Sequence, residues 1–256
     1  PLPEILQELL RVGQREMRNP IEIEFAVKLD VPLGKPKEFS FLQIRPIVES
    51  VETVSKLPEN LNVLDTIIYS ESALGNGKYE NICDVVYVKP QTFNSANTRD
   101  IAKAVEAINK KFVAANKPYI LVGPGRWGSS DSWLGIPVLW SQISAAKIIV
   151  ESGLNDFRID PSQGTHFFQN LTSFKVGYLT INPFIKDGFF DVDYLNEQEA
   201  VFEDSYLRHI SFKNPLTVIV DGTNNKAAIF KAGISLKDIY PNEEKTDEEL
   251  PPEGFM

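Results

Sequence analysis

The glycines between residues 123 and 128 are the first candidates for chemistry in this sequence. An apolar run at residues 119–122 leads into GPGRWGSSD, which spans residues 123–131. Glycine lets a backbone turn tightly and approach a ligand closely, and successive backbone N–H groups in such a turn can hold an anion. Arg126 would add a fixed cation with a forked donor set. The candidate anion-binding residues here are Gly123, Gly125, Arg126, Gly128 and Ser129.

The same stretch allows two other interpretations. It can be a sharp surface turn with Trp127 and Trp133 packed into the core. Its glycines also match the G-x-G-x-x-G pattern of dinucleotide-binding folds. However, Gly135 and Pro137 follow, so no helix begins at once to hold a pyrophosphate, and no later strand ends in the expected acidic residue.

A histidine in a second segment could belong to the same site. Gly164-Thr165 precedes an amphipathic run, which predicts a helix that begins with Thr165 as its N-cap. His166 would then lie in the first helical turn, where the helix favours a neutral imidazole and attracts anions. We expect Arg126 and His166 to lie near each other in a concave site. The alternative is a packed, structural His166.

A third set of polar residues lies near the start of the chain. Residues 21–27 and 39–45 alternate apolar and polar side chains, and the loop between them contains Pro32, Gly34 and Pro36. This pattern predicts a β-hairpin with a long loop. One face of it would present Glu24, Gln43 and Arg45 together. A carboxylate can hold magnesium, while an amide and a guanidinium can hold phosphate oxygens. An exposed polar face without a ligand is the alternative.

The helix, Asn19-Pro20, IEIEFA and FLQIRPI together resemble the end of the nucleotide-binding domain of the phosphoenolpyruvate synthase and pyruvate phosphate dikinase family. The resemblance covers about the first fifty residues and implies the last part of an ATP-grasp domain. The family's metal-binding glutamate corresponds to Glu24, and its nucleotide-binding glutamine and arginine correspond to Gln43 and Arg45. The loop between the strands is longer than we expect for the family.

The resemblance implies ATP and Mg²⁺ as cofactors and phosphoryl transfer as the chemistry. GPGRWGSSDSWLGIPV together with QGTHFFQNLTSF also resembles carboxyl-terminal regions of large bacterial phosphoenolpyruvate-synthase-like proteins. The family's phosphorylatable histidine likewise follows a glycine and a threonine, but Phe167 and Phe168 replace the small residues after it.

The family's earlier lysine and arginine ligands, its glycine-rich phosphate loop and its pyruvate-binding domain have no counterpart in the sequence. Pro1 also stands at the start of a predicted helix, so we expect the chain to be a carboxyl-terminal piece of a longer kinase-like transferase. We therefore assign no catalytic residue, and expect the piece to be inactive alone. Pyruvate or a similar small substrate would bind to other domains. The alternative is a non-catalytic ligand-sensing or interaction module whose glycine loop binds an anion.

Composition excludes several classes of function. The net charge of −9 over 256 residues leaves no basic excess for nucleic acid. One cysteine rules out an internal disulfide and fits a reducing cytoplasm, and with only two histidines it argues against structural zinc. No apolar run is long enough to span a membrane. We expect a cytoplasmic protein with no nucleic-acid or membrane partner.

Three segments follow from these patterns. We predict an ATP-grasp end at residues 1–50, a mixed-sheet α/β accessory domain at 51–240 and an acidic flexible tail at 241–256. The fold class is therefore mixed α/β (α+β). The predicted helices cover residues 4–18 and 97–115, the second with Asn97 as its cap. The predicted strands of the accessory domain are residues 63–70, 82–88, 119–122, 144–150, 174–181, 206–212 and 216–220, followed by a hairpin turn at 221–225.

The order strand, helix, strand before the glycine loop predicts a parallel crossover. The loop would then leave the carboxyl end of a strand, where ligands bind in open α/β sheets. Cys83 lies inside a predicted buried strand, so we interpret it as a packing residue. His209 lies in another strand and is interpreted as a residue on a sheet face.

Overall fold

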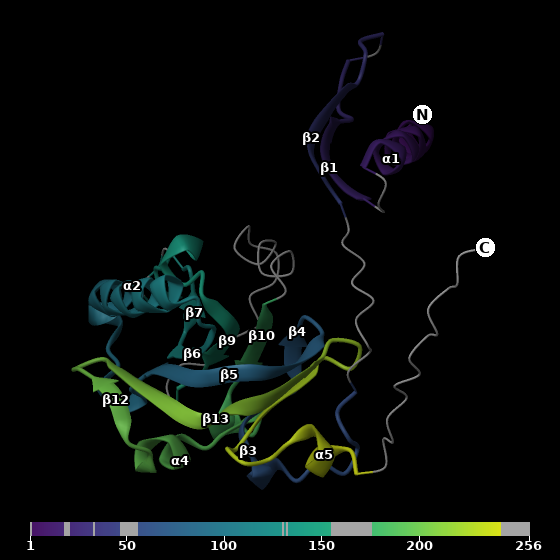
Figure 1. The fold of residues 1–256 in the computed structure, drawn as a ribbon. Helices are drawn as coiled ribbons and strands as arrows, with labels where there is room; N and C mark the ends of the chain where they lie inside the picture. Colours follow the sequence, from purple (N-terminus) through teal and green to yellow (C-terminus); the bar gives the residue numbers. More distant parts are fainter. Residues whose placement is uncertain are drawn as a thin grey trace. The chain divides into compact units, whose positions relative to one another are not determined.

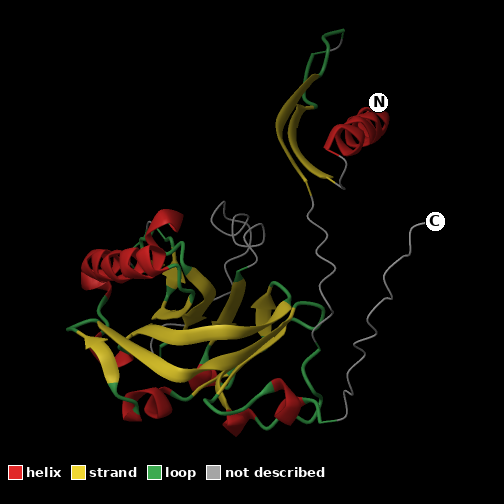
Figure 2. Cartoon of the chain, in the orientation of Figure 1, coloured by secondary structure: helices red, strands yellow, loops and turns green. Residues whose placement is uncertain are grey.

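The computed structural model describes residues 2–17, 21–32, 34–46, 56–129, 131, 133–154 and 176–241. The chain divides into two compact units, Pro1–Glu52 and Thr53–Met256 (Figure 1). Most of the regular structure is strand, with a few helices (Figure 2), which confirms the predicted mixed α/β class. The predicted tail lies almost wholly outside the described residues.

The first unit consists of one helix and one hairpin. Helix α1 covers Leu2–Met17, and strands β1 and β2 cover Ile21–Lys28 and Glu38–Pro46 in antiparallel register, as the sequence predicts. Gly13 lets the helix lie against the hairpin, because a Cβ atom there would be 2.3 Å from Cδ1 of Ile21 and 2.7 Å from Cδ1 of Ile44. The isoleucine face of the hairpin therefore packs on α1.

This unit has almost no core of its own. Among its described residues only Gly13 and Ile21 are buried. Large apolar side chains remain exposed on the hairpin, including Phe41 at 45% and Leu42 at 58%. A unit of this size that buries so little apolar surface lacks the main driving force for folding by itself.

The second unit is built on one long sheet. Its strands are β3 (Thr66–Ser70), β4 (Ser72–Leu74), β5 (Gly77–Val88), β6 (Tyr119–Pro124), β9 (Ala146–Ser152), β10 (Gly177–Ile181), β11 (Phe189–Phe190), β12 (Ala200–Glu203), β13 (Leu207–Asp221) and β14 (Lys226–Phe230). A separate small pair is formed by β7 (Arg126–Trp127) and β8 (Gly135–Ile136). The helices are α2 (Thr98–Ala115), α4 (Val192–Glu197) and α5 (Leu236–Ile239).

Short 3₁₀ turns join several of these elements. They are η1 (Val63–Asp65), η2 (Pro90–Thr92), η3 (Ser95–Asn97), η4 (Trp140–Gln142) and η5 (Pro183–Ile185). The first of them occupies the beginning of the predicted strand 63–70, so β3 is shorter than predicted.

The sheet is mixed and its strand order is β11-β3-β14-β13-β5-β6-β9-β10-β4, with β12 paired to β13. Strands β5, β6, β9 and β10 run parallel to one another, and the other pairings are antiparallel. The predicted parallel connection from β5 through α2 to β6 is therefore present. The glycine loop begins at the carboxyl end of β6.

The sheet curls until strands from its two ends meet. Strands β3 and β4 are consecutive in the chain, yet β4 is the last strand of the order and β3 is near the first. The Ser70 hydroxyl at the end of β3 donates to the Thr180 carbonyl of β10 at 2.7 Å. The Ala73 amide of β4 donates to the Asn225 carbonyl of the β13–β14 turn at 3.0 Å.

Three clusters of apolar side chains cover the surfaces of the curled sheet. Alternate residues of the central strands, such as Ile120, Ile148 and Leu179, form one cluster. Their neighbours on the opposite face pack beneath α2. A third, smaller cluster around Phe230 packs against residues 57–61 and α5. The alternation follows from the two-residue period of a strand.

Helix α2 is fixed to the sheet by a buried amide. The Asn109 side-chain oxygen accepts from the Ala145 amide at 3.0 Å and from the Tyr119 hydroxyl at 3.2 Å. Asn97 stands at the predicted N-cap position, but its side chain makes no capping hydrogen bond, so the predicted capping mechanism is wrong. The Asn94 side chain instead accepts from the Ala96 amide and begins the preceding 3₁₀ turn, η3.

The two strands predicted at residues 206–212 and 216–220 are one strand, β13. Pairing with β5 is interrupted between Ser211 and Leu216, where the register shifts. Pro215 lies in this interruption, where its missing N–H costs no ladder hydrogen bond. The proline therefore marks an irregularity within one strand and not the boundary between two.

Candidate functional site

The hairpin of the first unit brings the predicted nucleotide-binding positions into register. Glu24 pairs directly with Gln43. Two residues away along the strands, Glu22 pairs with Arg45. Facing residues of an antiparallel pair lie on the same side of the sheet, and residues two apart share that side. These four positions therefore share the face of the hairpin opposite Ile23 and Ile44.

This arrangement has the donor types that a magnesium–phosphate group needs. Glu24 is half-buried and Gln43 is exposed, so both positions are within reach of a ligand. Glu22 lies two residues before Glu24 on the same face and interacts with another group of the protein. Among the described residues no three acidic, histidine or cysteine side chains gather as a metal site. Magnesium bound with a nucleotide takes only one or two protein carboxylates, which this face can supply.

Packing and backbone geometry explain the glycines of the second predicted site. Gly125 and Gly128 have φ values of +76° and +80°, which glycine adopts without strain. A Cβ atom at Gly123 would lie 2.3 Å from the Trp127 ring, which covers this position. Trp127 is buried, with 2% of its surface exposed. The loop therefore folds back over the end of β6 with the tryptophan beneath it.

The backbone N–H groups of this loop are already used inside the protein. The Gly125 amide donates to the Ser152 carbonyl, the Arg126 amide to that of Leu134 and the Gly128 amide to that of Ile136. The Trp127 amide donates to a Glu151 carboxylate oxygen at 2.9 Å. A nest for an anion needs amides that point at the ligand. The amides of residues 125–128 do not provide one.

A buried glutamate lies under the loop. Glu151 is fully buried at the carboxyl end of β9 and is paired in register with Gly123 of β6 and Thr180 of β10. The Thr180 hydroxyl is also buried and has no hydrogen-bond partner among the described residues. The Glu151 side chain accepts from the Trp127 amide, so it uses a donor that a bound anion would need. The physical arrangement therefore favours the surface-turn interpretation of Gly123, Gly125 and Gly128.

The remaining predicted residues of this site are placed as follows. Arg126 is half-buried and interacts with other groups of the protein. The Ser129 hydroxyl donates to the Asp131 carbonyl and accepts from the Asp131 amide, so it stabilises the turn. His166 lies outside the described residues, and its expected proximity to Arg126 stays a prediction. Trp133 is 74% exposed, so its expected place in the core was wrong.

The structure also forms a polar cluster that the sequence did not indicate. His209 Nε2 lies 2.8 Å from Asp84 Oδ1, and the Phe112 ring packs against the imidazole. Burial acts to raise the pKa of Asp84, but hydrogen bonds from His209 and Ser211, with the charges of His209 and Lys117, lower the pKa below its usual value. The carboxylate stands between the histidine and the serine. In a nucleophilic triad the histidine holds that middle position, so we assign no catalysis to this cluster.

Cys83, next to Asp84, does not change this conclusion. Burial raises the pKa of its thiol, the Asp84 carboxylate raises it further, and Lys117 opposes both effects only in part. The thiolate is the nucleophilic form of cysteine, so a raised pKa disfavours reactivity at neutral pH. Cys83 is half-buried and belongs to none of the three apolar clusters, so its expected packing role stays a prediction.

We expect Asp84→Asn to lower the free energy of unfolding by about 1–3 kcal/mol at pH 7, because it removes a buried, charge-assisted hydrogen bond. Since the pKa of Asp84 is lowered in the folded protein, its contribution is present above the unfolded pKa of about 3.9 and is lost as the pH falls through the folded value. Urea titrations at pH 7 and pH 3 measure the difference. Ser211→Ala keeps the Asp84–His209 contact, so it should lower the free energy of unfolding by less than Asp84→Asn does. An equal loss in the two variants would contradict the stabilising role of the Asp84–His209 contact.

Two further findings bear on function. Among the helices described, none is both long and apolar enough to cross a membrane. Comparison of the chain with family models, curated proteins and solved structures gives no match. We therefore draw its function from the residues and their geometry.

Proposed function

We propose that this chain is part of a phosphoenolpyruvate-synthase-like, ATP-dependent phosphotransferase and that residues 1–50 supply late residues of its ATP–magnesium site. The observation that carries the proposal is the cross-strand register, which pairs Glu24 with Gln43 and leaves Arg45 two residues further along the same strand. The resemblance of the first fifty residues to the ATP-grasp domain of that family supports it. Residues 51–240 act as an accessory domain.

Each residue has a distinct role in this proposal. The Glu24 carboxylate binds Mg²⁺, and the Gln43 amide and the Arg45 guanidinium donate hydrogen bonds to phosphate oxygens of ATP. When bound, Mg²⁺ neutralises charge on the phosphates during transfer. The acceptor is pyruvate or a similar small molecule, bound by other domains. Such an enzyme would use the ATP of the cytoplasm.

A single hairpin face cannot complete this chemistry. Phosphoryl transfer requires charge stabilisation on both sides of the transferred group. The described residues of the first unit offer one polar face and bury only Gly13 and Ile21, so they provide no second wall to close on a nucleotide. We therefore expect the chain alone to be inactive.

The decisive experiment is made on the protein as the cell produces it. We expect Glu24→Gln to lower ATP- and pyruvate-dependent formation of phosphoenolpyruvate and AMP at least about a hundredfold, as removal of a transition-state-stabilising group does. Glu38→Gln is the matched control, since Glu38 is an exposed carboxylate of the same hairpin paired with Lys28. Equal activity of the two variants would rule out the proposed role of Glu24. Turnover by the 256-residue chain alone, abolished by Glu24→Gln, would contradict the need for a second wall.

A further inference from the structure

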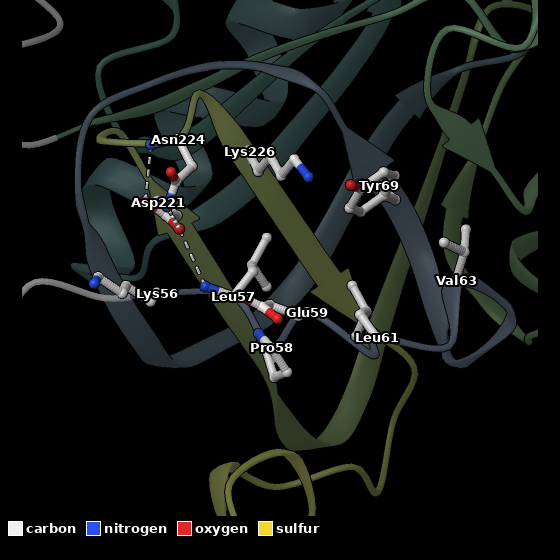
Figure 3. Close-up of a pocket in the computed structure, with 10 residues that line it drawn as sticks. All are labelled: Lys56, Leu57, Pro58, Glu59, Leu61, Val63, Tyr69, Asp221, Asn224 and Lys226. Atoms are coloured by element: carbon white, nitrogen blue, oxygen red, sulfur yellow. Dashed lines mark hydrogen bonds between the residues drawn. The ribbon is translucent and has the colours of Figure 1, made fainter.

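The second unit contains a cavity of about 470 Å³ that is separate from the glycine loop in sequence and in the sheet order (Figure 3). One wall is the segment 56–63, and the other is formed by β3, β14 and the β13–β14 turn. The lining residues are Lys56, Leu57, Pro58, Glu59, Leu61, Val63, Tyr69, Asp221, Asn224 and Lys226. Its volume falls within the usual range for small-molecule sites, roughly 300–1,000 Å³.

The most deeply buried charge of the cavity is already satisfied. Asp221 is 1% exposed and accepts from the Leu57 amide at 3.2 Å, the Asn224 amide at 3.1 Å and the Asn224 side chain at 2.8 Å. Burial acts to raise the pKa of Asp221, but these hydrogen bonds, with one from the Thr223 amide, lower the pKa below its usual value. Asp221 therefore fixes the wall 56–63 to the sheet and offers little acceptor capacity to a cationic ligand.

Lys226 is the cation that faces the cavity. Figure 3 shows its side chain extended toward the Tyr69 hydroxyl, whereas the ammonium of Lys56 points away from the other lining residues. Burial raises the pKa of Tyr69, the Lys226 ammonium opposes this in part, and the Glu71 carboxylate, which accepts from the hydroxyl at 3.4 Å, raises it further; the hydroxyl therefore stays protonated at neutral pH. An ammonium has three donors and no acceptor. Lys226 can therefore donate to an anion while it also contacts Tyr69.

Apolar side chains form part of the remaining lining, beside Lys56, Asn224 and one exposed carboxylate. Leu57 and Leu61 belong to the cluster around Phe230, and Pro58 and Val63 extend the same wall. That carboxylate belongs to Glu59, which is exposed. A carboxylate on the wall weakens the binding of multiply charged anions more than that of single charges. This lining fits a singly charged head on an apolar body.

We propose that this cavity binds a small organic monocarboxylate, with its carboxylate on Lys226 and its apolar chain against Leu57 and Leu61. The site is independent of the proposed nucleotide face, since none of its lining residues belongs to the first unit. Its ligand would stabilise the second unit, because binding to the folded state alone favours folding.

The test is a titration of the purified chain with acetate, butanoate and octanoate, followed by NMR. The affinity should rise by up to about fourfold for each methylene group that is buried, whereas octylamine and inorganic phosphate should bind more weakly than octanoate. Lys226→Gln should weaken octanoate binding about tenfold or more. Glu59→Gln should strengthen it, because it removes a like charge from the wall.

Lys103→Gln is the matched control, since Lys103 is an exposed lysine on α2 that pairs with Asp100 in the preceding turn. It should leave octanoate binding unchanged, and circular dichroism should show all variants folded. Lys226→Glu provides a second arm, in which the preference should reverse from octanoate to octylamine. Equal binding by Lys226→Gln and Lys103→Gln would overturn the proposal, as would no binding of octanoate at millimolar concentration.

Discussion

Replacement of Gly135 by alanine is expected to lower the free energy of unfolding of the second unit by about 3 kcal/mol, the upper end of the usual cost of overpacking. A Cβ atom at Gly135 would lie 1.9 Å from the Arg126 carbonyl oxygen and 2.4 Å from the Arg126 nitrogen. Both atoms belong to the backbone of β7, which must therefore move. The hydrogen bond from the Arg126 amide to the Leu134 carbonyl would be lost with it.

Urea unfolding followed by tryptophan fluorescence measures this effect, because all three tryptophans lie in the second unit. Gly233→Ala is the matched control. Gly233 has a φ of +94° but nothing within 4 Å of a Cβ atom, so its replacement should cost only the strain of a left-handed alanine, about 1–2 kcal/mol. If both variants lose the same free energy of unfolding, crowding against β7 is not the reason that position 135 requires glycine.

Asp221→Asn is expected to lower the free energy of unfolding by about 2–4 kcal/mol at pH 7. The carboxylate accepts several hydrogen bonds in a buried position, and each bond to a charged acceptor contributes about 1.5–3 kcal/mol. Asparagine keeps one acceptor oxygen, so only part of this stabilisation is lost. The asparagine amide group would also turn a donor toward the Leu57 or Asn224 donors. The wall 56–63 should detach first, because Leu57 is the residue that Asp221 holds.

The pH dependence of the effect has a definite sign. The pKa of Asp221 is lowered in the folded protein, so its stabilisation is present above the unfolded pKa of about 3.9 and disappears as the pH falls through the folded value. Unfolding titrations should therefore show the largest difference between wild type and Asp221→Asn at neutral pH. Asp65→Asn, at an exposed aspartate, is the control and should change stability by less than about 0.5 kcal/mol. A pH-independent cost would mean that the charge of Asp221 contributes nothing.

The sequence by itself determined the local elements and one functional face. The 3.6-residue period gave α1 and α2, and alternation gave the hairpin with Glu24, Gln43 and Arg45 at neighbouring facing positions. These signals are local, because a strand repeats every two residues and a helix every 3.6. The roles proposed for those positions stay predictions.

The tertiary structure alone decided where the hydrogen bonds of the glycine loop go. Its amides find acceptors on Leu134, Ile136, Glu151 and Ser152, which come from segments that follow the loop in the chain. Nothing in GPGRWG itself distinguishes amides that point at a ligand from amides that point at a neighbouring strand. The position of Glu151 under the loop likewise depends on the parallel pairing of β6, β9 and β10.

The same holds for the contacts between distant residues. Asp84 and His209 are 125 positions apart, and only the antiparallel pairing of β13 with β5 brings them to 2.8 Å. Asp221 and Leu57 are 164 positions apart, and their hydrogen bond forms one side of the cavity. Long-range pairing is set by burial of the whole sheet and by register, which no single stretch of sequence contains.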